Sequence, residues 1–314
     1  MRRMVNGTVL LKTERGSYMV RSKKFNGRIA DIIIYFILIL IIIICLIPII
    51  NTLALSLSSS IAANAGKVFL WPVDFTMASY DQIINDSAYL RALVVSFART
   101  IVGTTVTFVI IVFMAYPLSK SAKIFPKRNI YLWFIIGAML FSGGLIPTFM
   151  VISKLGLINS FWSMIIPCAV PVFSMILIMN YMKGLPAEVE ESSQIDGASP
   201  LTTLVHIIVP MSKPVLATVA LFTASGHWNQ YFDAMIYMND PSKWPVQTYI
   251  QSLNVSVQQI SSVTDPNEIA RLLKISGVTF NAAKVFVAMI PILIVYPFVQ
   301  KFFVGGIVMG AVKG

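Results

Sequence analysis

The sequence predicts an all-α protein with a polytopic membrane fold: six transmembrane helices and one helical connection on the cytoplasmic side. Of the 314 residues, 57% are hydrophobic and only 12% are charged, and a soluble domain usually carries about twice that charge, roughly 25%. The hydrophobic residues form long blocks, and a helix of about 20 residues is long enough to cross hydrocarbon ~30 Å thick. Most Lys and Arg residues flank these blocks, as membrane topology requires.

Each apolar block predicts one spanning helix. The first, Ile32 to Ile50, holds no charged residue, and no small-residue cleavage site follows a short apolar core, so we expect a retained helix. The second runs from Thr100 to Leu118 and begins earlier, near Leu90. Lys284, near one end of the last block, is expected to extend its amine to the membrane interface. The remaining blocks are Ile130 to Ile152, Trp162 to Met182, Pro214 to Phe232 and Asn281 to Phe303.

The basic residues predict the orientation of the chain. They concentrate in the tail before Ile32, in the loop 119–129, between Lys183 and Lys213, and near the C-terminus. With six spans these segments share one side, so both termini are predicted to be cytoplasmic. We divide the chain into a cytoplasmic tail, 1–28, and a transmembrane domain, 29–314. The net charge of +11 therefore reflects membrane topology, and no nucleic acid partner is expected.

No catalytic or metal-binding constellation is predicted. Cys45 and Cys168 each lie inside an apolar block, which is typical of small packing residues and not of a disulfide framework. His206 and His227 are too few and too isolated for a metal site. A membrane-embedded enzyme would need a convergent nucleophile, base or metal set. An ion-gradient-coupled secondary transporter would need carboxylates near the bilayer midplane, and apart from the peripheral Asp233 the six blocks show none.

A polar connection, 184–213, joins the fourth and fifth blocks on the predicted cytoplasmic side. Pro186 at the first helical position starts a short helix, and Gly197 ends it in a left-handed conformation. Ser199 caps a second helix, which Pro200 opens. The residues alone allow two interpretations. One is an ordinary interfacial connection, and the other is a helix that docks on a cytosolic partner and passes its movement to the spans on either side.

This connection resembles the EAA loop of permeases from binding-protein-dependent ATP-binding-cassette importers. The family pattern is Glu-Ala-Ala, three residues, Gly, nine residues, then Ile-x-Leu-Pro. Here Glu191-Ser192-Ser193 takes the first place, Gly197 follows at the required spacing, and Ile207-Ile208-Val209-Pro210 closes the pattern. The departures are Ser192 and Ser193 for the two alanines and Val209 for leucine, all of them small or conservative. Asp196-Gly197-Ala198 also matches the sugar-importer version of the loop, Asp-Gly-Ala.

The resemblance covers most of the chain and implies a type I importer permease in the bacterial cytoplasmic (inner) membrane. It is closest to the branch of maltose-type second permeases that serves complex oligosaccharides, including acidic ones; a permease of the same kind for a non-sugar solute is the alternative. The implied contacts with the ATPase are made by Glu190, Glu191, Ser192, Ser193, Asp196, Gly197, Ala198, Ile207 and Pro210.

The same resemblance implies the partners. They are a second homologous permease subunit, two ATP-binding subunits, an extracellular or periplasmic sugar-binding protein, and membrane lipid. No cofactor is expected in this chain, because ATP and Mg would be bound by the partner ATPase and the sequence lacks the Walker A pattern G-x-x-x-x-G-K-[ST].

A polar and aromatic cluster near the end of the fifth block is the predicted substrate path. Sugar sites usually combine an aromatic platform with groups that pair with hydroxyls, and an acid at membrane depth marks a functional site by default. The alternatives are a hydrated acid and aromatic residues of the interfacial belt. Arg91 and Arg99, near the outer end of the second block, either attract an anionic sugar or extend to the interface. The predicted path residues are His227, Trp228, Asn229, Tyr231 and Asp233.

Overall fold

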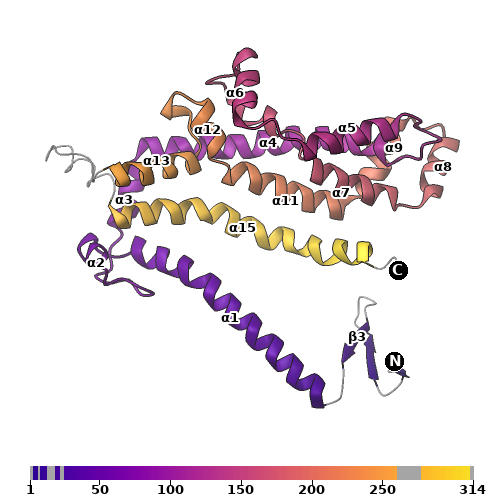
Figure 1. Ribbon diagram of the computed structural model, residues 1–314. Helices are drawn as coiled ribbons and strands as arrows, with labels where there is room; N and C mark the ends of the chain where they lie inside the picture. The colour runs from indigo at the N-terminus through magenta and orange to yellow at the C-terminus, as the bar shows by residue number, and fades with distance from the viewer. Residues whose placement is uncertain (1–2, 6–7, 13–17, 22–24, 260–276, 312–314) are drawn as a thin grey trace.

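The computed structural model describes residues 3–5, 8–12, 18–21, 25–259 and 277–311. Its long helices lie side by side in one elongated bundle, and one helix diverges from it (Figure 1). Three helices are long and apolar enough to cross a membrane, and there are up to six spans if each bent pair of helices counts as one. The chain is therefore a multi-pass helical membrane protein, as the apolar blocks predict.

The first span, α1 (Phe25–Ser56), is the diverging helix. Its apolar side chains between Ile32 and Ile44 are all exposed, and the most apolar part of the span buries none of its residues within the chain. Only towards its C-terminal end does α1 meet the rest of the fold, where it packs against α15 (Val278–Ala311). Because so large an apolar surface is unfavourable in water, this helix faces lipid or another protein.

The centre of the bundle is α4 (Ser87–Ser119), against which α7 (Val172–Lys183) and α11 (Lys213–Asn229) pack. Asp86 caps α4 by accepting a hydrogen bond from the backbone N–H of Tyr89, which explains why the helix begins before the apolar block does. The largest buried cluster joins these three helices in the half of the bundle near Ile111 and Met175. At Gly103 of α4 the ring of His227 lies so close that an added Cβ would be 2.7 Å from it.

Two predicted spans are bent rather than continuous. The third is two helices, α5 (Arg128–Leu140) and α6 (Leu145–Lys154), which meet at 115°. The break contains Gly144 with φ +84°, a conformation that side chains with a Cβ rarely adopt. The fourth predicted span bends by 49° between the short turns η1 (Phe161–Met164) and η2 (Ile166–Cys168) and helix α7. The helix of the fifth block, α11, is unbroken, and an 85° bend separates it from the segment Pro200–Met211 that precedes it. The expectation that the third and fourth blocks each form one continuous helix is therefore wrong.

Polar connections gather at the two ends of the bundle (Figure 1). One end holds α2 (Ser60–Asn64), α3 (Ala78–Asn85), α12 (Phe232–Tyr237), η4 (Pro241–Lys243) and α13 (Val246–Gln259). The opposite end holds α8 (Ala187–Ile195), α9 (Pro200–Thr203), η3 (Leu204–Ile208) and α10 (Val209–Met211). The C-terminal end of α15 points towards this second end.

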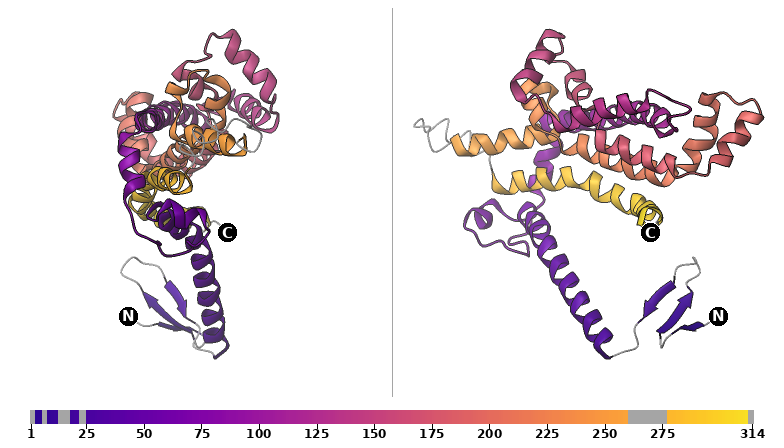
Figure 2. Two further views of the ribbon diagram at one scale, coloured as in Figure 1. Left: turned by 90° about the vertical axis from the view of Figure 1, so that its left-hand side faces the viewer. Right: turned by 45° about the vertical axis from the view of Figure 1, so that its right-hand side comes forward.

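The N-terminal tail forms a small antiparallel sheet, which the sequence did not predict. Its strands are β1 (Arg3–Val5), β2 (Thr8–Lys12) and β3 (Tyr18–Arg21), in the order β1-β2-β3. Leu10 pairs with Arg3 on one side and with Val20 on the other. Figure 2 shows the sheet beside the far end of α1, away from the bundle. The membrane part is all-α as predicted, and α1 begins at Phe25, slightly before the boundary expected at residue 28.

Candidate functional sites

The connection 184–213, which we term the coupling elbow, is built by local capping. Helix α8 follows Pro186, which occupies the N-cap and not the first helical position that we expected. The helix ends at Gly197, whose φ of +78° is the predicted left-handed conformation, and the N–H of Ala198 returns to the carbonyl of Ser193 at 2.9 Å. The Ser199 hydroxyl accepts from the N–H of Thr202 at 3.2 Å and so caps α9 as predicted.

Two contacts hold the inner face of the elbow. The hydroxyls of Ser193 and Thr203, both buried, lie 3.0 Å apart and join α8 to α9. The Glu190 carboxylate forms an ion pair with the ammonium of Lys120, the residue that follows α4. That ammonium also lies 3.8 Å from the ring centroid of Tyr116, and burial lowers the pKa of Lys120 to about 8. The elbow is therefore tied to the central helix of the bundle.

The predicted ATPase contacts divide into two faces. Glu190 and Ser193 point inward, as described, and Ala198 and Ile207 are half-buried. The exposed members, which together we term the outward face of the elbow, are Glu191, Ser192, Asp196, Gly197 and Pro210.

Apolar residues also belong to this outward face, and the sequence did not predict them. Ile195 is 87% exposed at the end of α8, and Leu201 and Val205 are exposed nearby. Their only signal was an isoleucine standing among polar residues just before Asp196. An exposed apolar residue between acids, on an elbow that projects from the bundle (Figure 2), is suited to contact with another protein.

A cavity of 190 Å³ lies within the bundle between α4, the bend before α7, and α11. Its polar and apolar side chains come from all three segments, and one of them, Cys168, is an exposed residue. The lining residues are Arg99, Cys168, Pro171, Ser174, Phe222, Thr223, Gly226, His227 and Gln230.

Arg99 at one wall of this cavity is fully buried and paired with Asp233. Its Nη1 lies 3.1 Å from Oδ1 of Asp233 and also donates to the carbonyl of Gln230 at 3.0 Å; Nη2 donates to the carbonyl of Met164 at 3.3 Å. Of the alternatives left open by the sequence, an Arg99 that extends to the interface and a hydrated Asp233 are therefore both excluded. The pair joins α4 to η1 and α12 across a buried, low-dielectric space.

Of the five predicted path residues, His227 alone lines the cavity. Trp228 is buried between helices, where its indole N–H donates to the carbonyl of Ala288 at 3.1 Å and its ring packs edge-on to Phe97. Asn229 is exposed and donates to the carbonyl of Ser225.

Tyr231 is 40% exposed, and its carbonyl accepts from the hydroxyl of Thr248. Asp233 touches the cavity only through its partner Arg99. The cluster expected from proximity in sequence is thus separated in space, because successive helical residues point to different faces.

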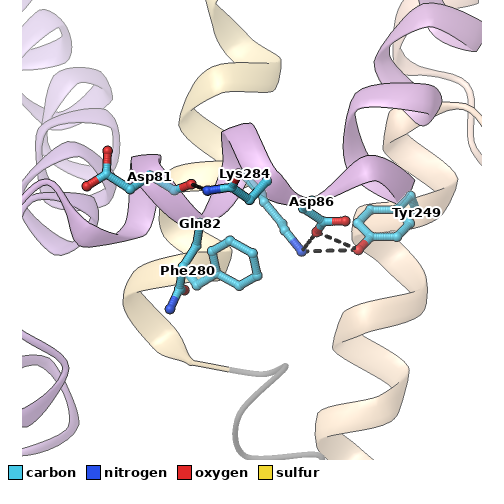
Figure 3. Close-up of a pocket in the computed structure, with 7 residues that line it drawn as sticks. Asp81, Gln82, Asp86, Tyr249, Phe280 and Lys284 are labelled. Atoms are coloured by element: carbon cyan, nitrogen blue, oxygen red, sulfur yellow. Dashed lines mark hydrogen bonds and ion pairs between the residues drawn. The ribbon is translucent and has the colours of Figure 1, made fainter.

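A second pocket, of 520 Å³, opens at the end of the bundle that holds α3 and α13, opposite the elbow (Figure 1), and Figure 3 shows the residues that line it. Lys284 is 1% exposed there, with its amine 2.8 Å from the Asp86 carboxylate, 3.1 Å from the Tyr249 hydroxyl and 3.9 Å from the ring centroid of Phe280. The expectation that Lys284 extends to the interface is therefore wrong; it joins α15 to α13 and to the start of α4.

Lys284 also controls the acid that faces it. Partial burial acts to raise the pKa of Asp86, but the hydrogen bond and charge of Lys284 and the backbone N–H of Tyr89 outweigh it, so the net pKa is lowered. Burial and the negative charge of Asp86 raise the pKa of Tyr249. Among the described residues, no group of three or more His, Cys, Asp or Glu side chains is placed to hold a metal ion.

A family model described as "Binding-protein-dependent transport system inner membrane component" matches residues 88–308. The Bacillus subtilis (strain 168) "Polygalacturonan/rhamnogalacturonan transport system permease protein YtcP" is 36% identical over 92% of this chain and 100% of its own length. Protein LplC of the same organism is 37% identical over 92% of this chain and 96% of its own.

One solved structure is similar in both sequence and fold. It is a chain of "a bacterial ABC transporter involved in the import of the acidic polysaccharide alginate", with a TM-score of 0.79 and 32% identity over 90% of this chain and 99% of that chain.

Proposed function

The chain belongs to the inner membrane components of binding-protein-dependent transport systems, and on that premise we propose that it is the permease subunit of an ATP-driven importer of oligosaccharides, acidic ones included. The cargo rests on the relatives, which are named for polygalacturonan, rhamnogalacturonan and alginate. ATP coupling rests on one observation, the coupling elbow with its outward Glu191, Ile195 and Asp196.

The proposed assembly has a second, homologous permease, two ATP-binding subunits and an extracellular or periplasmic sugar-binding protein. ATP and Mg bind to the ATPase subunits, and this chain performs no catalysis. The elbow, the tail 1–28 and the C-terminus face the cytoplasm, and residues 29–314 form the permease domain. Figure 1 supports this orientation, since the far end of α15 points to the side of α8.

The contacts of the elbow suggest how movement reaches the spans. The ATPase dimer closes on ATP and displaces α8 through the outward face. Lys120 and Glu190 pass that displacement to α4, and the Ser193–Thr203 contact passes it through η3 and α10 to α11. Because α4 and α11 form two walls of the 190 Å³ cavity, the same movement changes the space between them.

Reconstituted transport tests this proposal. The complete transporter is placed in liposomes, and uptake of a labelled uronate oligosaccharide is measured with the binding protein outside and ATP on the ATPase side. We expect uptake with ATP and none with a non-hydrolysable analogue. Uptake that needs only an ion gradient, or a transporter that carries a non-sugar solute instead, would overturn it.

A further inference from the structure

Two residues that line the 190 Å³ cavity carry buried polar atoms without a hydrogen-bond partner. They are Nε of Arg99 and Oγ1 of Thr223, and both side chains are more than nine-tenths buried. Buried polar groups in native proteins nearly always have a partner, in the protein, in water or in a ligand. A donor from α4 and a hydroxyl from α11 at one cavity therefore indicate that a polar molecule occupies it.

The other lining groups define the chemistry of that molecule. Ser174 adds a hydroxyl, Gln230 an amide and His227 a ring nitrogen, so both donors and acceptors are offered. Phe222 and Pro171 add apolar surface suited to C–H groups. The volume equals that of about six waters at ~30 Å³ each, which favours one ring over an extended oligomer.

The charge of the cavity argues against a carboxylate as the ligand group that the cavity recognises. Arg99 is the cation on its wall, and Asp233 already neutralises it with a two-point contact. An anionic ligand would have to displace that carboxylate from a buried site. Hydroxyl groups face no such competition.

We infer that this cavity is a sugar-contacting subsite inside this subunit, and that it binds the hydroxylated face of one neutral or charged sugar ring through Thr223, Ser174, Gln230 and Nε of Arg99. The inference rests on the proposed function. It assigns recognition of sugar hydroxyls to this chain and leaves recognition of the uronate charge elsewhere in the transporter.

Accessibility of the cavity gives the first test. In the assembled transporter with Cys45→Ser, Cys168 is the one cysteine of this chain, and it is an exposed residue that lines the cavity. We expect a small methanethiosulfonate reagent to label Cys168, and labelling to slow when cargo, binding protein and ATP are present together. Cargo-independent labelling would overturn the inference. A Cys45→Ser/Cys168→Ser transporter sets the background.

Removing one hydroxyl gives the second test. Thr223→Val should lower uptake at saturating loaded binding protein by about fivefold, the typical worth of one hydrogen bond, equally for a neutral and an acidic oligosaccharide. Thr223→Ser should restore it. Thr218→Val, on the same helix but outside the cavity and bonded to the Pro214 carbonyl, is the matched control.

The results separate the two proposals. A wild-type rate in Thr223→Val with uptake still dependent on ATP would reject the subsite alone. A loss confined to acidic cargo would reject the assignment to hydroxyls. Failure of ATP-dependent sugar uptake in the unaltered transporter would reject the proposed function itself.

Discussion

The ammonium of Lys120, at the end of α4, is paired with the carboxylate of Glu190 on α8. The neighbouring Glu191 is exposed. Two consecutive acids of the elbow therefore have different surroundings, although both were expected to contact the ATPase. Glu190 anchors the elbow to the bundle, and Glu191 is available to a partner. Substitutions at the two positions should therefore have different effects.

Breaking the anchor should uncouple ATP hydrolysis from transport. Lys120→Met or Glu190→Gln removes an ion pair between side chains that are only 14% and 21% exposed. A loss of about 1 kcal/mol corresponds to about fivefold in equilibrium, so uptake per ATP hydrolysed should fall by that order. The ATPase should still co-purify with the permease, because the outward face is intact.

The control for the anchor is Lys123→Met, an exposed lysine of the same loop. The exchanged pair Lys120→Glu/Glu190→Lys should recover part of the coupling. Equal uptake per ATP in Lys120→Met and in wild type would contradict a role for this pair.

Substitutions on the outward face should instead weaken ATPase association. Glu191→Ala removes an exposed acid, and Gly197→Asp adds a side chain where φ is +78°, at a cost of about 1–2 kcal/mol. Both should reduce co-purified ATPase and transport while the permease still inserts. Gly197→Asn is the matched variant at the same site, because Asn has nearly the size of Asp and a similar tolerance of this conformation but adds no charge. If Glu191→Ala and Gly197→Asp both transport at the wild-type rate, the coupling role of the elbow is wrong.

Coupling should decline as pH rises above about 8. Burial lowers the pKa of Lys120 to about 8, so the folded protein loses this proton, and the ion pair, well before an unfolded lysine titrates near 10.4. Between these values the unfolded state binds more protons, so this residue makes folding more favourable as pH rises. Uptake per ATP should therefore fall without a fall in Tm. Lys120→Arg, which keeps its charge, should remove this pH dependence. If uptake per ATP falls with pH in Lys120→Arg as it does in wild type, titration of Lys120 is not the cause.

The capping residues of the elbow could be predicted from the sequence, whereas the ion pairs between residues far apart in the chain could not. Gly197 and Ser199 act through backbone groups a few residues away, so their roles can be read from neighbouring sequence. Arg99 and Asp233 are 134 residues apart, and nothing in either segment identifies the other as a partner. Lys284 and Asp86 escaped prediction for the same reason. The sequence alone therefore allowed solvated positions for Arg99, Asp233 and Lys284 that the folded chain does not give them, and it predicted nothing for Asp86.

Apolar length predicted where spans lie but not where they bend. The bend in the third span falls at Gly144, directly after Ser142 and Gly143, and that signal was present in the sequence. It was outweighed by the hydropathy of the flanking residues, which is high on both sides of the break. Helix continuity depends on a few backbone conformations, and average hydropathy does not report them.

A methyl group at Gly103 should destabilise the protein, because α4 and α11 approach each other closely there. An added Cβ would lie 2.7 Å from the His227 ring, which is buried and packed against Thr107. Gly103→Ala should destabilise the detergent-solubilised permease by about 1–3 kcal/mol, measured as a lower Tm. Gly137→Ala, in α5 with open space around it, is the matched control and should not lower Tm. Gly103→Ala/His227→Ala should recover stability, and a Tm that stays low in the double variant would place the clash elsewhere.

Substitutions in the Arg99–Asp233 pair should be strongly non-additive, with the double variant less damaging than either single variant. Asp233→Asn leaves a buried guanidinium without its counter-charge, which costs about 3–5 kcal/mol. Arg99→Met leaves the complementary carboxylate and should be similarly damaging. The double variant Arg99→Met/Asp233→Leu buries no charge and should be closer to wild type in Tm than either single variant. Arg91→Met, at a surface position near the same end of α4, should change Tm little. Additive losses in the double variant would show that the two side chains stabilise the fold independently, against the paired geometry that joins α4 to α12.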